Sequence, residues 1–191
     1  MRPSPLLTLA LIACTPPWKG LSVSFGDTGV DTAPEEPPEE EGPCGGWSSE
    51  WSALEEEVLA LVNEVRAQGY TCYDGYKPPA DPLTMEPLLR CAARLHSQDM
   101  GENNFFSHTG SDGSSMSQRV EAQGYVGWFS LGENIAAGID RSRDAVDLWL
   151  ASTEGHCSNI MGSGYSEIGI GAYFSDRSSY GWYWTQDFGS R

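Results

Sequence analysis

Two histidines and one glutamate lie in polar stretches where their side chains could do chemistry. His108 follows "NNFFS", Glu133 is the acid of "GENIAAG" (132–138), and His156 follows "STEG". Imidazole nitrogens and a carboxylate bind divalent metals such as zinc, and the same groups exchange protons near neutral pH. We therefore treat the three residues as a candidate, weakly held zinc site, and His108 and Glu133 as the candidate catalytic pair. Hydrogen bonds that cap loops are the alternative role.

His96 is the third histidine, and we expect it to be structural because it falls inside a predicted helix beside the buried stripe. Motifs of well-known enzyme classes are missing from the sequence. There is no H-E-x-x-H helix, no G-x-S-x-G nucleophile elbow and no phosphate-binding glycine loop. Spacing alone therefore names no reaction.

Helical periodicity accounts for most of the chain before residue 151. Ser52 and Glu55 form a capping-box pattern ahead of apolar residues at helical spacing, and Gly69 ends this predicted helix. Further helices are expected over 86–102 and 115–123. Ser142 is the expected cap of a fourth helix, and "GENIAAG" is expected to be a loop before it.

The C-terminal part changes to the alternation of strands. Apolar residues at 168, 170, 172 and 174 predict one strand, "YGWYWTQDF" (180–188) predicts a second, and "SDRSS" joins them as an antiparallel hairpin. Helices followed by a small antiparallel sheet indicate an α+β fold. We expect Trp149, Trp182 and Trp184 in its core.

The N-terminal segment predicts export. Residues 1–14 read as a signal peptide, and "LIAC" resembles a bacterial lipobox in which Cys14 is lipidated; an ordinary signal peptide with an incidental cysteine is the alternative. The acidic, proline-rich residues 15–46 are expected to be a disordered tether, and residues 47–191 the domain. We therefore expect a monomeric cell-envelope lipoprotein on the periplasmic or extracellular face, attached to the membrane through Cys14.

The composition argues against a nucleic-acid partner and a membrane-spanning segment, and the number of cysteines predicts disulfides. A net charge of −16 argues against nucleic acid, and no stretch reaches the roughly 20 apolar residues of a membrane span. Cys44, Cys72, Cys91 and Cys157 remain after Cys14, an even number that predicts disulfides. Of three possible connectivities we favour Cys72–Cys91, which leaves Cys44 and Cys157 to pair or stay free.

The ordered motifs resemble those of the CAP superfamily, which groups cysteine-rich secretory proteins, antigen 5 and plant pathogenesis-related class 1 proteins. They occur across residues 54–189, and the chain is most similar to the bacterial SCP-like extracellular branch. The motifs that carry the resemblance are "LVNEVRAQG", "LLRCAARLHSQDM", "NNFFSHTGSDGSS", "RVEAQGY", "LGENIAAG", "AVDLWLASTEGHCSNIM", "SEIGIGAY" and "YWTQDFG".

The resemblance implies an α-β-α sandwich with a polar cleft, which in eukaryotic members holds two His and two Glu that can bind zinc. His108 and Glu133 match the first His and one Glu. Ser152 stands where the second Glu would be, and Tyr183 where the second His would be. We expect His156 to approach the cleft in place of the lost histidine, and Asn134 and Asn159 to be structural.

Three functions follow from the resemblance. We favour a non-enzymatic binding module that presents its cleft to a small molecule, a lipid or a protein partner. A peptidase-like hydrolase that positions water with His108 and Glu133, with or without a metal, is the alternative. A structural or adhesive envelope protein with a vestigial cleft is the third.

Overall fold

The computed structural model describes residues 44–191, so the predicted signal peptide, Cys14 and most of the predicted tether lie outside the described residues. The elements follow in the order α1 (Ser49–Gln68), β1 (Tyr70–Cys72), β2 (Gly75–Lys77), β3 (Thr84–Met85), α2 (Pro87–Glu102), α3 (Met116–Ala122), β4 (Ser130–Ala137), α4 (Ser142–Ala151), α5 (His156–Ile160), β5 (Glu167–Phe174) and β6 (Trp182–Ser190). None of the helices within residues 44–191 has the length and apolar character that crossing a bilayer requires.

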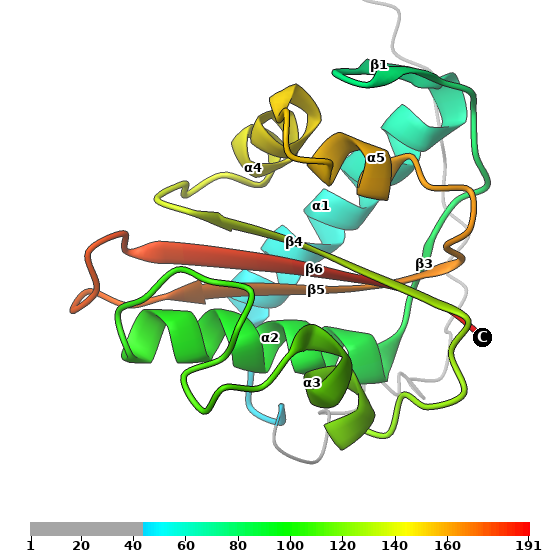
Figure 1. Cartoon of the computed structure of the whole chain (residues 1–191). Helices are drawn as coiled ribbons and strands as arrows, with labels where there is room; N and C mark the ends of the chain where they lie inside the picture. The colour runs from blue at the N-terminus through cyan, green and yellow to red at the C-terminus, as the bar shows by residue number, and fades with distance from the viewer. Residues whose placement is uncertain (1–43) are drawn as a thin grey trace, which may run out of the picture. The chain divides into compact units, whose positions relative to one another are not determined.

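A four-stranded sheet in the order β3-β5-β6-β4 forms the middle layer. Strands β5 and β6 pair antiparallel, as the alternation predicts. Strand β4, in a segment expected to be a loop, also pairs antiparallel with β6, while the two-residue β3 joins β5 in parallel. Helices α2 and α3 lie on one side of the sheet, and α4 and α5 on the other (Figure 1). The α+β sandwich expected from the sequence is therefore confirmed.

The face of the sheet opposite α2 carries the main apolar core. Alternate residues of β5 and β6, among them Ile168, Ile170 and Trp184, pack there with apolar side chains of α1 and α4. Trp149 and Trp184 are fully buried, and Trp182 packs partly buried against the same cluster, which confirms the expected core tryptophans.

The other face of the sheet approaches α2 closely because β5 carries two glycines there. A Cβ at Gly169 would lie 2.0 Å from the backbone of Leu89, and one at Gly171 would lie 2.4 Å from that of Ala93. Real side chains never sit so close, so these positions fix the distance between α2 and the sheet. That distance in turn buries the polar side chains that the sheet points toward α2.

Two predicted helix caps are wrong. Helix α1 begins at Ser49, one turn before the predicted cap, so Ser52 and Glu55 lie inside it. The Glu55 carboxylate is buried and accepts hydrogen bonds from Arg90 and Arg94 of α2, which explains its position better than a cap does. Ser142 is the first residue of α4, and its hydroxyl donates to the carbonyl of Leu54.

The favoured disulfide Cys72–Cys91 is also wrong. The structure pairs Cys44 with Cys91 and Cys72 with Cys157, with Cα–Cα distances of 5.5 and 5.7 Å. The short β1–β2 hairpin folds toward α5 rather than α2, and so Cys72 meets Cys157. Cys44 is buried against α2, which extends the folded domain to a point before the predicted boundary at residue 47.

Candidate functional site

Glu133 lies on the edge strand of the sheet, not in the loop that we expected. Residues 130–137 form β4, which pairs with β6 alone among the strands of residues 44–191, and Glu133 stands opposite Asp187 in this pair. Side chains alternate along a strand, so Glu133 shares the α2-facing side of the sheet with Asp187. Its side chain is only 5% exposed.

Three basic side chains from three different segments surround the Glu133 carboxylate. His108 Nδ1 lies 2.7 Å from Oε1, and Arg119 Nη2 of α3 donates to Oε2 at 2.5 Å. His96 Nε2 of α2 lies 4.0 Å from Oε2. Burial alone would raise the pKa of Glu133, but the hydrogen bond from His108 and the charge of Arg119 outweigh it and hold the pKa below its ordinary value.

The protonation of His108 follows from its partner. A carboxylate only accepts hydrogen bonds, so His108 Nδ1 carries a proton and donates it to Glu133. The Nε2 atom is left for other contacts, and the side chain is 57% exposed. A carboxylate that fixes the tautomer of an exposed imidazole is an arrangement suited to binding or to general base chemistry.

His96 is buried, as expected of a structural residue, but its neighbours tie it to the site. Its Nε2 lies 3.0 Å from the carbonyl oxygen of Ser107, which can only accept, so Nε2 carries the proton. Burial lowers the pKa of His96, which keeps the ring neutral and leaves Nδ1 as an acceptor. That Nδ1 has no hydrogen-bond partner among the described residues.

His156 stands at the start of α5, close to the end of α4. Its Nδ1 lies 2.7 Å from the hydroxyl of Ser152, the residue that follows α4. Burial lowers the pKa of His156, and the charge that nearby His108 carries when it is protonated lowers it further. Both imidazoles line the same stretch of surface, so His156 lies on the side of the domain where the sequence predicted it.

A cleft opens along the β4 edge between these residues and has a polar and an apolar half. The polar half, about 480 Å³, includes Ser107, His108 and Glu154 in its walls. The apolar half, also about 480 Å³, includes Leu148, Trp149 and Tyr180. Three residues belong to both halves, so the two form one continuous surface: Phe106, Ile135 and His156.

Of the two further residues expected in the cleft, Ser152 and Tyr183, only Ser152 lines it. Ser152 lines the apolar half, as expected. Tyr183 does not line it: its side chain is fully buried beneath the surface, in a cluster with Met100 and Ile135. The alternation of side chains along β6 turns Tyr183 inward. The exposed ring beside the cleft is that of Tyr180, and its centroid lies 6.0 Å from the ring centroid of Phe106.

The outer edge of β4 is closed to a further strand. Its carbonyls at Leu131, Glu133 and Ile135 accept hydrogen bonds from side chains. The donors are the Tyr165 hydroxyl, the Asn159 amide and the Trp149 indole. A peptide therefore cannot bind here by extending the sheet, because the acceptors that it would need are occupied.

Asn134 and Asn159 have the structural role that we expected. Asn134 is buried, and its amide donates to the carbonyl of His156 and to the side chain of Gln186. Asn159 donates to Asn134 as well as to the backbone of Glu133. Together the two amides fix α5, and hence His156, against β4.

The predicted zinc ligands do not form a ligand set as they are placed. Both oxygens of Glu133 are already held by His108 and Arg119, so this carboxylate acts on the imidazole and not outward. Only the Nε2 atoms of His108 and His156 remain. No group of three or more His, Cys, Asp and Glu within residues 44–191 is arranged to hold a metal ion.

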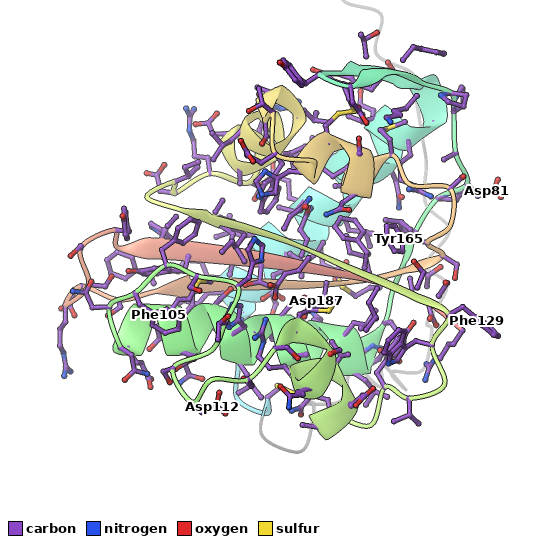
Figure 2. The ribbon with its side chains drawn as sticks, viewed as in Figure 1. Asp81, Phe105, Asp112, Phe129, Tyr165 and Asp187 are labelled. Atoms are coloured by element: carbon purple, nitrogen blue, oxygen red, sulfur yellow. A yellow bond between two sulfur atoms is a disulfide. The ribbon has the colours of Figure 1, made fainter. Side chains whose placement is uncertain are left out.

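Two members of the site, the partly buried Arg119 and the fully buried Asp187, were not predicted from the sequence. Arg119 lies in a short helix whose sequence gives no sign that the side chain turns toward β4. Asp187 is fully buried beside Glu133, and Figure 2 labels it among the side chains between the sheet and α2. A signal for Asp187 was present, because it is an acidic residue within a segment that the sequence predicts to be a strand rich in aromatic residues.

Comparisons with known proteins agree with this architecture. The family model described as the cysteine-rich secretory protein family, CAP, matches residues 59–188. The membrane protein YlbC and the protein YkwD of Bacillus subtilis are each 34% identical to the chain, over 74% and 72% of its length. The chain spans only 36% and 47% of these two relatives.

Solved structures show the same fold. An extracellular SCP-domain protein of Bacillus anthracis superposes with a TM-score of 0.60 at 26% identity, covering 73% of this chain and 41% of that one. An outer surface protein of Borrelia burgdorferi gives 0.56 at 20% identity, covering 73% and 91%. With the family model matching most of the described domain, this chain belongs to the CAP family of cysteine-rich secretory proteins.

Proposed function

We propose that this domain is a non-catalytic binding module, exported and anchored at the cell envelope through Cys14, that takes a small amphipathic ligand in the cleft beside β4. The observation that carries the proposal is the continuity of the polar and apolar halves through Phe106, Ile135 and His156. The names of relatives, an extracellular protein, an outer surface protein and a membrane protein, support the location.

The chemistry of the polar half favours an uncharged head group. His156 has a lowered pKa and is neutral at pH 7, and the carboxylate of Glu154 lines the same wall. A hydroxyl or amide of the ligand can both donate to Glu154 and accept from an imidazole N–H. The apolar half then receives the tail, at about 0.8 kcal/mol for each CH₂ that becomes buried.

A substitution of Leu148 best tests whether the apolar half binds the tail of the ligand. It lines the apolar half and is 49% exposed, so its substitution should not disturb the core. We expect monooctanoylglycerol, titrated below its micellar concentration, to bind the wild-type protein, and Leu148→Ser to weaken that binding roughly fivefold. His156→Ala should weaken it too.

Val126→Ser is the matched control for this titration, because Val126 is 61% exposed and lines neither half of the cleft. It should bind the ligand as the wild type does. Equal binding by the wild type and all three variants would reject the proposal.

A hydrolase is the second candidate, and the 2.7 Å contact between His108 Nδ1 and Glu133 favours it. An imidazole oriented by a carboxylate can accept a proton from water at its free nitrogen. Activity on a fluorogenic peptide library that disappears in Glu133→Gln would support this candidate. Ser152 is a weaker nucleophile candidate, because its partner His156 has no carboxylate among the described residues to orient the ring.

Zinc binding stays a prediction, with the ligands reduced to the two imidazoles. No step of the proposed binding depends on a metal. A metal held at His108 and His156 would supply a positive charge at the polar half of the cleft.

A further inference from the structure

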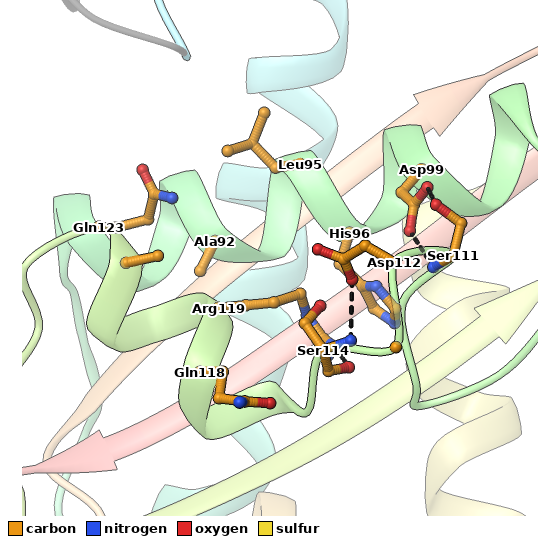
Figure 3. A pocket seen from close by; sticks show the side chains of 12 residues that line it. Ala92, Leu95, His96, Asp99, Ser111, Asp112, Ser114, Gln118, Arg119 and Gln123 are labelled. Carbon is orange, nitrogen blue, oxygen red and sulfur yellow. Dashed lines mark hydrogen bonds between the residues drawn. The ribbon is translucent and has the colours of Figure 1, made fainter.

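A second groove lies on the α2–α3 side of the domain and shares no residue with the cleft beside β4. It has a volume of about 560 Å³ and is bounded by α2, α3 and the loop 110–114 (Figure 3). One end is polar and contains Asp99, Asp112 and Ser114. The rest of the lining combines the aliphatic side chains of Ala92, Leu95 and Ala122 with the polar side chains of Gln118 and Gln123.

The polar end brings oxygen acceptors together around one glycine. A Cβ placed on Gly110 would lie 2.6 Å from Ser114 Oγ, 2.9 Å from Asp112 Oδ1 and 3.4 Å from Asp99 Oδ2. Hydrogen bonds hold this arrangement, since Ser111 donates to Asp99 and the Ser114 amide donates to Asp112. The bonds from Ser114 lower the pKa of Asp112, so its charge persists at neutral pH.

A buried acceptor without a partner lies at the same end. His96 is completely buried and lines the groove, and its Nδ1 has no hydrogen-bond partner among the described residues. Because Nε2 donates to Ser107, Nδ1 is an acceptor when the ring is neutral. An unpaired buried acceptor is costly, and a ligand that donates to it removes that cost.

The positive charge in the wall of the groove belongs to Arg119, and the carboxylate of Glu133 neutralises it. Arg119 directs its guanidinium to Glu133 and to the carbonyls of His108 and Ser114, and its Nε is buried without a partner among the described residues. The pair Arg119–Glu133 is neutral as a unit, which leaves the carboxylates of Asp99 and Asp112 as the net charge of the groove. An anionic ligand is therefore disfavoured, and a cation is attracted.

We propose that this groove binds a cationic alkyl group, an ammonium or guanidinium on an aliphatic stem. The head donates to Asp99, Asp112 and His96 Nδ1, and the stem lies along Ala92, Leu95 and Ala122. A free polyamine and a basic side chain of a peptide carry the same chemistry, so the two sources are separated by experiment.

The test titrates spermidine and, separately, a trilysine peptide into the isotopically labelled protein and follows the amides of Gly110 and Gly113. We expect saturable shifts at these amides. Asp112→Asn keeps the acceptor for the Ser114 amide but removes the charge, and should weaken binding about three- to tenfold. Asp176→Asn is the control: it removes the same charge from a side chain that is 82% exposed and outside the groove, and should have less than about a twofold effect.

The outcomes separate clearly. Tighter binding of trilysine assigns the groove to a peptide partner, and tighter binding of spermidine to a free polyamine; both support the site. Unsaturable shifts, or equal weakening by Asp112→Asn and Asp176→Asn, would mean only general attraction to an acidic protein and would overturn it. His156→Ala should leave binding unchanged, because the β4 cleft is separate.

Discussion

The buried acids Glu133 and Asp187 stand directly opposite each other in the β4–β6 pair. Glu133 is paired with His108 and Arg119, whereas neither oxygen of Asp187 has a hydrogen-bond donor among the described residues. Complete burial, and then the charge of Glu133, raise the pKa of Asp187 well above its ordinary value. The site therefore combines a carboxylate whose pKa is lowered, Glu133, with a carboxyl group whose pKa is raised, Asp187.

Asp187→Asn should make the protein more stable than the wild type at higher pH, because the variant lacks the buried carboxyl group that must ionise. Because the folded-state pKa is raised, the folded protein holds a proton that the unfolded chain releases above its ordinary carboxyl pKa. Stability from this group is thus present below that pKa and falls as pH increases toward the raised value, by at most about 1.4 kcal/mol per pH unit. Urea unfolding across the range from weakly acidic to weakly basic pH should show a flatter slope for the variant. An unchanged slope would show that Asp187 is ionised.

Glu133→Gln should cost roughly 2–4 kcal/mol of unfolding free energy, because it leaves the guanidinium of Arg119, only 11% exposed, without its counter-charge. Denaturant unfolding at neutral pH measures it. The exposed Glu154→Gln provides the comparison and should change stability by less than about 0.5 kcal/mol.

Gly169→Ala should separate α2 from the sheet or unfold the domain, since the added methyl would lie 2.0 Å from the backbone of Leu89. We expect a loss of at least about 3 kcal/mol. Gly164→Ala is the matched control, because no atom lies within 4 Å of a Cβ there. Thermal unfolding of both variants is sufficient, and equal melting temperatures would contradict the close approach.

The disulfides should be recovered as Cys44–Cys91 and Cys72–Cys157 when the protein is digested without reduction and analysed by mass spectrometry. Replacing Cys72 and Cys157 by serine should lower stability by about 2–4 kcal/mol, because the pair closes a long loop of chain. Peptides linking Cys72 to Cys91 would disprove the observed connectivity.

Zinc should bind more weakly than micromolar, because only two imidazole nitrogens are free to hold it. Calorimetry at weakly basic pH should show that weak binding is lost in His108→Ala and in His156→Ala. Tight binding that survives either substitution would place the metal elsewhere. Tight binding lost in Glu133→Gln would show that this carboxylate leaves Arg119 to become a ligand.

The sequence by itself determined the class of fold and most of its elements. Helical periodicity over α2 and the alternation over β5 and β6 are local properties, so they predicted these segments within a few residues. The ordered motifs also pointed to His108, Glu133 and His156 as one group. Local pattern failed where a residue serves a distant partner: Glu55 resembles a cap but bonds α2, and "GENIAAG" resembles a loop but is an edge strand.

Only the tertiary structure decided what surrounds the site. The pairing of β4 with β6 sets Asp187 beside Glu133, although the two lie far apart along the chain, and no local signal records that pairing. The glycines of β5 admit α2 close enough to bury His96, and α3 then brings Arg119 to the same carboxylate. The tertiary structure also decides which cysteines pair and which residues line the cleft, because both depend on how the layers pack and not on the preferences of any one segment.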